Sequence, residues 1–113
     1  MSARNGTWNG MNWIRQSKRQ AIYDRDGHKC IYCGSNGDDS RLTLDHLKPV
    51  ELGGTNRASN LVTCCLLCNS SKGRKSLTNF LLTLEQQGVD ITEMKQRIRR
   101  HTRRKLKNYK ERL

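Results

Sequence analysis

Apolar residues recur at helical spacing near both ends of the chain. Near the start, the recurring residues are Trp13, Ile14, Ala21 and Ile22. This pattern runs through Asp26 and stops at Gly27, so it predicts a first helix that glycine ends. In the second half, the recurring residues are Leu77, Phe80, Leu81 and Leu84. They predict an amphipathic helix that ends at Gly88 and buries one face.

A last helix is expected to begin near Asp90. Asp90 and Glu93 have the spacing of a capping box, and Val89 and Met94 have the spacing of the hydrophobic staple that accompanies it. The apolar line of this helix is thin and consists of Ile91, Met94, Ile98, Leu106 and Tyr109. Residues 95–113 carry ten Lys or Arg and one acid, Glu111. The expected helix therefore presents mostly positive charge.

The middle of the chain, over residues 28–73, consists of short pieces rich in turns. Leu42-Thr43-Leu44 alternates apolar and polar residues, and this pattern predicts a strand. The strand places Asp45 and His46 at its end. A loop with one proline and two glycines then leads to Asn60-Leu61-Val62.

A short helix is expected around Cys65 to Cys68, with Asn69 and Lys72 on it. The chain then divides into three regions. They are a flexible N-terminus (residues 1–11), a central domain with its N-terminal helix (residues 12–75) and a helical, basic C-terminal extension (residues 76–113).

The small size of the chain limits the core that it can build. It has 113 residues, of which 34% are hydrophobic, and a single Phe, so it forms one small domain that needs an additional link for stability. Cys30 with Cys33, and Cys65 with Cys68, make two C-x-x-C pairs. Two such pairs supply four thiolates to one tetrahedral ion. The sequence therefore predicts a structural Zn²⁺ site.

Two further residues leave the ligand set open. Cys64 could replace Cys65 with a C-x-x-x-C spacing, although we favour Cys65 and interpret Cys64 as a small core residue. His28 precedes Cys30 by two positions and could also be a ligand, but a solvated turn histidine is the favoured interpretation. A less favoured interpretation of the cysteines is a set of buried or redox-active thiols.

The charge of the chain indicates its partner. Lys and Arg number 22 against 10 Asp and Glu, which gives a formal net charge of +12. This balance favours nucleic acid first and an anionic membrane only second. The candidate phosphate contacts are Lys72, Arg74, Arg99, Arg100, Arg103 and Arg104. A solvated surface and a tail that docks a protein are the alternatives for these residues.

The location is expected to be the cytoplasm. Paired cysteines without a disulfide framework are typical of a reducing compartment. No stretch has the length of a membrane span, and the polar start of the chain lacks the apolar run of a signal peptide.

Several of these residues together resemble the HNH endonuclease family. They are Leu44-Asp45-His46-Leu47-Lys48-Pro49, Gly53-Gly54, Asn60-Leu61-Val62 and Cys65-Leu66-Leu67-Cys68-Asn69-Ser70-Ser71-Lys72-Gly73. The resemblance covers roughly residues 19–73. It implies an α+β fold: a small ββα-metal domain, treble-clef-like, with a structural four-cysteine zinc site. An N-terminal helix and basic C-terminal helices would flank this domain.

The resemblance also implies a role for each polar residue. His46 would be the general base, Asp45 and Asn69 would hold a catalytic divalent metal, and Asn60 would order the loop that positions the histidine. The chain departs from the letters of the family name because its third position is Asn69 rather than histidine. Asparagine also occurs there within the family.

Elementary chemistry is consistent with those roles. Hydrolysis of a phosphodiester needs an activated water, a cation on the phosphate oxygens and help for the leaving group. Histidine titrates nearest neutral pH, so His46 can accept a proton from water. Asp45 and Asn69 are hard oxygen donors that suit Mg²⁺ or Mn²⁺ and leave room for water and phosphate.

We therefore predict a metal-dependent endonuclease that cleaves double-stranded DNA and leaves a 5′-phosphate and a 3′-hydroxyl, as the family does. The alternatives are a non-catalytic zinc module that binds nucleic acid and a zinc finger that binds an acidic protein. Neither needs Asp45, His46 and Asn69 together. The chain also resembles free-standing HNH proteins of bacteriophages, which implies a bacterial host cell and a packaging terminase as a partner. The oligomeric state stays open.

Overall fold

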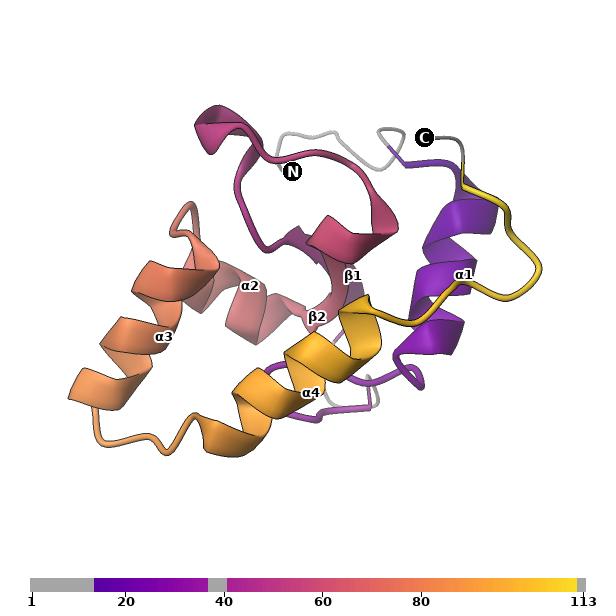
Figure 1. Cartoon of the computed structure of the whole chain (residues 1–113). Coiled ribbons are helices and arrows are strands. Elements are labelled where there is room, and N and C mark those ends of the chain that lie inside the picture. Colours follow the sequence, from indigo (N-terminus) through magenta and orange to yellow (C-terminus); the bar gives the residue numbers. More distant parts are fainter. Residues whose placement is uncertain (1–13, 37–40, 112–113) are drawn as a thin grey trace.

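The computed structural model describes residues 14–36 and 41–111. Its elements in chain order are α1 (Gln16–Arg25), β1 (Leu42–His46), the 3-10 helices η2 (Val50–Leu52) and η3 (Ala58–Asn60), β2 (Leu61–Cys65), α2 (Leu66–Lys72), α3 (Leu77–Gln86) and α4 (Thr92–Thr102). Figure 1 shows the two strands and α2 at the centre, with the other helices around them. The predictions for the N-terminus (residues 1–11) and for Trp13 lie outside the described residues.

The sheet consists of two short antiparallel strands. Leu42 lies opposite Cys65 at one end, and His46 lies opposite Leu61 at the other. All five residues of β2 are buried, because this strand is covered on both faces. The helix α2 follows β2 without a loop. The two strands and α2 form a small α+β unit, as predicted from the sequence.

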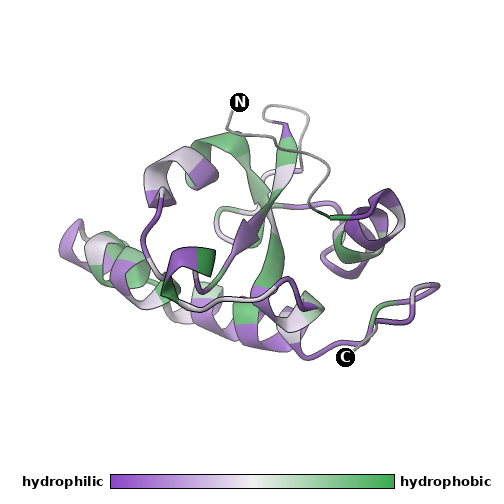
Figure 2. Ribbon diagram, turned by 90° about the horizontal axis from the view of Figure 1, so that it is seen from above, coloured by the Kyte–Doolittle hydropathy of each residue, from purple (hydrophilic) through white to green (hydrophobic). Residues whose placement is uncertain are grey.

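The larger apolar cluster joins distant parts of the chain. Its buried members are Cys30, Ile31, Tyr32, Val62, Cys64, Cys65, Phe80 and Ile98. Phe80 comes from α3 and Ile98 from α4, and the Phe80 ring meets the edge of Tyr32 with centroids 5.3 Å apart. The helices of the expected C-terminal extension therefore pack on the same core as the central region. Figure 2 shows hydrophobic residues concentrated in the strands and in stripes along the helices.

The helix α1 packs on the sheet through a smaller cluster and a buried ion pair. The cluster consists of Ile14, Ile22, Tyr23, Leu44 and Leu61. Just after α1, Asp26 accepts hydrogen bonds from Arg25 Nε at 2.8 Å and from the Thr63 amide at 2.9 Å. Both side chains are buried, so this pair locks the end of α1 against β2.

The helix α4 is shorter than the pattern of apolar residues indicated. It ends at Thr102, whose hydroxyl donates to the Ile98 carbonyl at 2.8 Å. Such a bond offers the backbone an alternative to the next helical turn. Leu106 and Tyr109 therefore follow the helix, on a segment that runs back along α1 (Figure 1).

The start of α4 also differs in detail from the expected capping box. Asp90 Oδ1 accepts a hydrogen bond from the Thr92 amide at 3.0 Å, but the residue at the N-cap position is Ile91. The Asp90 carboxylate therefore satisfies one amide of the first turn from a position one residue earlier. Within residues 14–36 and 41–111, no helix combines the length and the apolar character that a membrane crossing needs.

Candidate functional site

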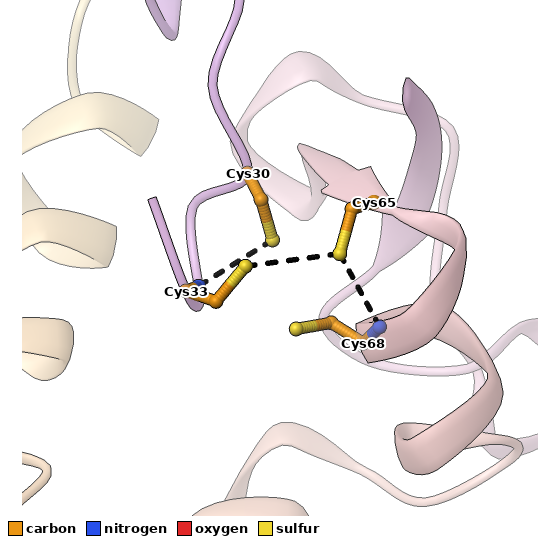
Figure 3. A group of neighbouring side chains, drawn as sticks. All are labelled: Cys30, Cys33, Cys65 and Cys68. Carbon is orange, nitrogen blue, oxygen red and sulfur yellow. Dashed lines mark hydrogen bonds between the residues drawn. The ribbon is translucent and has the colours of Figure 1, made fainter. Parts of the chain in front are cut away.

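Four cysteines converge at one end of the sheet. The sulfur atoms of Cys30, Cys33, Cys65 and Cys68 all lie within 4.8 Å of one another (Figure 3). Cys33 Sγ lies 3.7 Å from Cys65 Sγ. Four thiolates around a tetrahedral Zn²⁺ at about 2.3 Å would be about 3.8 Å apart, so this group fits zinc in both chemistry and spacing.

The geometry resolves the ambiguity in the ligand set. Cys64 is fully buried, and its thiol donates to the Cys65 carbonyl at 3.3 Å, outside the group. His28 is exposed and lies 2.7 Å from Asp24, so it is not part of the group either. The fourth member of the group is therefore Cys65, the residue favoured from the sequence.

The first cysteine pair is also held by α4. Arg97 donates from Nε to the Ile31 carbonyl at 2.8 Å and from Nη2 to the Tyr32 carbonyl at 2.9 Å. These are the two residues between Cys30 and Cys33. One guanidinium from the C-terminal half thus fixes the turn that carries two of the thiolates.

A polar cavity of about 410 Å³ opens near the other end of the sheet. Its lining includes Asp45 and His46 from β1, and Asn69 and Lys72 from α2. Arg74 lies on its edge, and η2 with the preceding Pro49 forms another wall. The structure therefore brings three of the four predicted catalytic residues, and both basic residues beside them, to one cavity.

Asp45 is buried and held by two donors. The Tyr32 hydroxyl donates to Asp45 Oδ2 at 2.6 Å, and Lys72 Nζ lies 3.1 Å from the same atom. Burial raises the pKa of Asp45 above its ordinary value, while the Lys72 charge and the Tyr32 hydroxyl oppose the shift without cancelling it. Burial and the nearby carboxylate raise the pKa of Tyr32, so its hydroxyl keeps the proton that it donates.

Lys72, a predicted phosphate contact, is buried rather than solvated at the surface. Its side chain is 1% exposed, and Nζ also donates to the His46 carbonyl at 2.9 Å. Any contact of Lys72 with a phosphate would therefore be made from within the cavity. Arg74 is exposed at the cavity, whereas the four arginines of the C-terminal part, Arg99, Arg100, Arg103 and Arg104, are exposed elsewhere.

His46 has a partner that the sequence did not reveal. His46 Nε2 lies 2.7 Å from Oδ1 of Asn56, a residue of the loop between the glycines and η3. An amide oxygen can only accept a hydrogen bond, so Nε2 of the ring is the donor in this contact. Asn56 is not among the residues that carried the resemblance to a known family. Its position in a polar loop was the sole signal available.

Asn60 does not line the cavity. Its Oδ1 accepts from the Lys48 amide at 2.9 Å, and its Nδ2 donates to the carbonyls of Lys48 at 3.1 Å and Thr55 at 2.8 Å. Asn60 thus closes the loop that runs between the strands. This position agrees with the loop-ordering role that was expected of it.

The residues present fit a divalent cation. Asp45 offers a carboxylate and Asn69 a carboxamide oxygen, and both line the same open cavity. Hard oxygen donors of this kind, few in number, suit Mg²⁺ or Mn²⁺ with water and phosphate as further ligands. Lys72 Nζ lies 3.1 Å from Asp45 Oδ2 and 3.4 Å from Oδ1, so a cation would share this carboxylate with the ammonium group.

Comparisons with known proteins agree with the fold. Residues 30–83 match the family model of HNH endonucleases. The chain is 36% identical over 82 residues to the CRISPR-associated endonuclease Cas9 of Corynebacterium diphtheriae, and the match covers 72% of this chain and 8% of that protein. It is also 36% identical over 75 residues to the CRISPR-associated endonuclease Cas9 of Actinomyces naeslundii, with 66% of this chain and 6% of that protein covered.

A solved structure has a similar fold. The crystal structure of the Type II-C Cas9 enzyme from Actinomyces naeslundii superposes with a TM-score of 0.52 at 24% identity. The match covers 84% of this chain and 12% of that one. The chain therefore spans only a small fraction of the length of each protein that it matches.

Proposed function

We propose, on the premise that this chain belongs to the HNH endonuclease family, that it hydrolyses phosphodiester bonds of double-stranded DNA in the cavity between β1 and α2. The observation that carries the proposal is the meeting of His46, Asp45 and Asn69 at one open, polar cavity. These side chains come from two elements that the sheet and the cysteine group hold side by side. A module that only binds DNA does not need this arrangement.

His46 would act as the general base. It lines the cavity, and its Nε2 faces an acceptor, which leaves the lone pair of the neutral ring on Nδ1. A nitrogen with a lone pair can take the proton of an attacking water. The products would be a 5′-phosphate and a 3′-hydroxyl.

Asp45 and Asn69, which both line the cavity, would hold Mg²⁺ or Mn²⁺. A cation bound there would neutralise charge on the phosphate and on the departing oxygen. Tyr32 and Lys72 keep the Asp45 carboxylate in place by hydrogen bonds at 2.6 Å and 3.1 Å. Because the Lys72 side chain also donates to the His46 backbone, it fixes both neighbouring residues of β1.

The basic residues would supply affinity for DNA. Arg74 at the cavity can contact the phosphate beside the cleaved bond, and Lys72 can add charge from within. The four exposed arginines in and after α4 can contact more distant phosphates. Each phosphate neutralised releases counterions, so binding would weaken with salt by a slope of about 0.9 per phosphate.

The biological setting is a separate part of the proposal. We propose the cytoplasm of a bacterial host as the location and a packaging terminase as a partner, on the resemblance to bacteriophage proteins alone. The names of the relatives mention neither. Copurification of a terminase subunit with the tagged chain from infected cells would support the partner, and its absence from such preparations would remove it.

A nicking assay with supercoiled plasmid tests the enzymatic proposal. With Mg²⁺ or Mn²⁺, the intact chain should produce nicked or linear DNA, and His46→Ala should lose at least about a hundredfold in rate, the usual contribution of a general base. His28→Ala is the matched control, because His28 is exposed and lies outside the cavity. Equal nicking by both variants, or no nicking by the intact chain, would leave only a DNA-binding module.

A further inference from the structure

We propose that Asn56 is the positioning residue of His46, and that Lys18 and Glu111 hold Asn56 in place from outside the cavity. The inference rests on the proposed role of His46 as general base. It adds residues that belong to no part of the recognised motif. The observation behind it is a continuous chain of contacts: His46 meets the Asn56 side chain, the Asn56 backbone carbonyl meets Lys18, and Lys18 meets Glu111.

The first step is the contact between the two side chains. His46 Nε2 and Asn56 Oδ1 are 2.7 Å apart. The amide oxygen has no proton to give, so the ring must donate from Nε2. In the neutral ring the lone pair then resides on Nδ1, and the plane of the ring is fixed by the direction of the bond. Asn56 thereby selects the tautomer as well as the orientation.

The second step is the support of the loop that carries Asn56. This residue is exposed and belongs to no helix or strand. Lys18 of α1 donates from Nζ to the Asn56 carbonyl at 2.6 Å. Asn60 donates to the carbonyl of Thr55, the preceding residue, at 2.8 Å. Two side chains from different elements therefore hold successive carbonyls of the loop.

The third step is the contribution of the C-terminal segment. Glu111 lies 2.7 Å from Lys18 Nζ and also accepts from the Ala58 amide at 2.6 Å. The Lys18 and Glu111 side chains are 12% and 21% exposed, so solvent screens this pair less than a fully exposed one. Glu111 thus orients Lys18 and holds the far side of the Asn56 loop at the start of η3.

The contacts join parts of the chain that are distant in sequence. Lys18 is 38 residues from Asn56, and Glu111 is 53 residues from Ala58. The segment after the basic helix therefore supports the histidine without reaching the cavity. Removal of Asn56 should act on the chemical step, since Asn56 does not line the cavity where DNA would lie.

Two substitutions of similar size separate positioning from a structural role. Asn56→Leu removes the acceptor, whereas Asn56→Asp keeps an oxygen at the same place. For Asn56→Leu we expect a fall in kcat of about tenfold to a hundredfold with KM nearly unchanged, a loss smaller than that of the base itself. For Asn56→Asp we expect kcat within about fivefold of the unaltered chain. Asn79→Leu, at an exposed position of α3, is the matched control.

A spectroscopic measurement tests the inference without any activity. In the zinc-loaded protein without Mg²⁺, ¹⁵N shifts of the His46 ring at neutral pH report which nitrogen carries the proton. The unaltered chain and Asn56→Asp should show the proton on Nε2, and Asn56→Leu should show a mixture of tautomers. An unchanged tautomer in Asn56→Leu would overturn the proposal even if the chain cleaves DNA. A mixture of tautomers in Asn56→Leu would support the proposal even if the chain does not cleave DNA.

Double variants test the role of Lys18 and Glu111. Lys18→Met and Glu111→Gln should each lower kcat by about threefold to tenfold, because they loosen the loop without removing the acceptor. Neither should lower kcat further in the Asn56→Leu background. Equal losses in both backgrounds would show that Lys18 and Glu111 act independently of Asn56. Zinc content and the thermal transition of each variant verify that it is folded.

Discussion

The two ends of the small sheet are built in different ways. At one end, Cys30 and Cys65 are 1% exposed and meet the sulfur atoms of Cys33 and Cys68, all within 4.8 Å of one another. At the other end, Asp45 and His46 border a cavity, and polar contacts with residues of distant segments hold them. The first end stabilises the fold, and the second remains open to a substrate. The comparison indicates that one short sheet separates the part that stabilises the fold from the part that can meet a substrate.

The helix α2 connects the two ends. Cys65 caps its start, since Cys65 Sγ accepts a hydrogen bond from the Cys68 amide at 3.4 Å. Asn69 follows in the same helix and faces the cavity, and Lys72 in its last turn reaches Asp45. A helix this short is not stable alone in water. Loss of the zinc site should therefore disturb the cavity, whereas a change in the cavity should leave the zinc site intact.

The largest effect is expected from the zinc end. Cys30→Ser, or removal of zinc by a chelator, should abolish the cooperative thermal transition. The binding of a structural zinc contributes about 10–16 kcal/mol, and small domains have only about 5–15 kcal/mol in total. Circular dichroism and metal analysis check the result.

The control for that prediction is the fifth cysteine. Cys64→Ala should keep one zinc per chain, since the Cys64 sulfur lies outside the four-cysteine group. Loss of zinc in Cys64→Ala with retention in Cys65→Ala would reverse the assignment of the fourth ligand. A Cys30→Ser variant that still binds zinc and still melts cooperatively would show that the complete four-cysteine zinc site is not needed for folding.

A smaller, local effect is expected from the cavity end. Asp45→Asn should reduce nicking by at least about a hundredfold, because a carboxamide replaces the charged oxygen donor of the divalent cation. The zinc content should stay at that of the unaltered chain. The measurements are plasmid nicking with Mg²⁺ and metal analysis of the same samples.

Asp24→Asn is the matched control for this substitution. Asp24 is exposed, contacts His28 and does not line the cavity. It should nick plasmid at the rate of the unaltered chain. If Asp45→Asn lost its zinc as well as its activity, the cavity and the zinc site would depend on each other, and the two ends of the sheet would not be independent.

Local patterns predicted the zinc end and the main lining of the cavity. The C-x-x-C spacing lets each pair of cysteines bind one ion, so the four-cysteine group could be predicted from the sequence. Asp45 and Asn69 belong to the short sequence motif itself, so their place in the cavity could be predicted as well. The antiparallel pairing of β1 with β2 then brings the motif together. The four-cysteine group and the main lining of the cavity were predictable because the segments that form them are parts of the motif.

The remaining contacts had no signal in the sequence. Tyr32, Asn56, Lys18 and Glu111 meet their partners only after the chain has folded, through hydrogen bonds between distant segments. Single polar residues in such contacts have no periodicity and no fixed spacing. The end of α4 was expected too late for a related reason, because Leu106 continues the apolar spacing although it packs on the cluster around α1 from a segment after the helix.

The smallest effect is expected from the substitution of Glu111. The pH dependence of the stability that Glu111 contributes also distinguishes the cavity end of the sheet from the zinc end. Burial acts to raise the pKa of Glu111, but the hydrogen bonds from Lys18 and the Ala58 amide outweigh it, so the pKa is lowered. A carboxyl group with a lowered pKa in the folded state contributes stability that is complete above its unfolded value of about 4.3 and is lost only as the pH falls through the lowered pKa. Thiolate ligands, by contrast, take up protons and release zinc on acidification.

The difference in melting temperature between the unaltered chain and Glu111→Gln should therefore stay constant from about pH 8 to about pH 5.5. Glu85→Gln, at an exposed position of α3, supplies the reference for loss of one charge. On further acidification, zinc release followed by a metal-sensitive dye should precede the loss of the Ala58 amide signal at its Glu111-bound position. If this difference in melting temperature shrinks between about pH 8 and about pH 5.5, Lys18 and Ala58 do not hold the Glu111 carboxylate. Other contacts would then have to support the Asn56 loop.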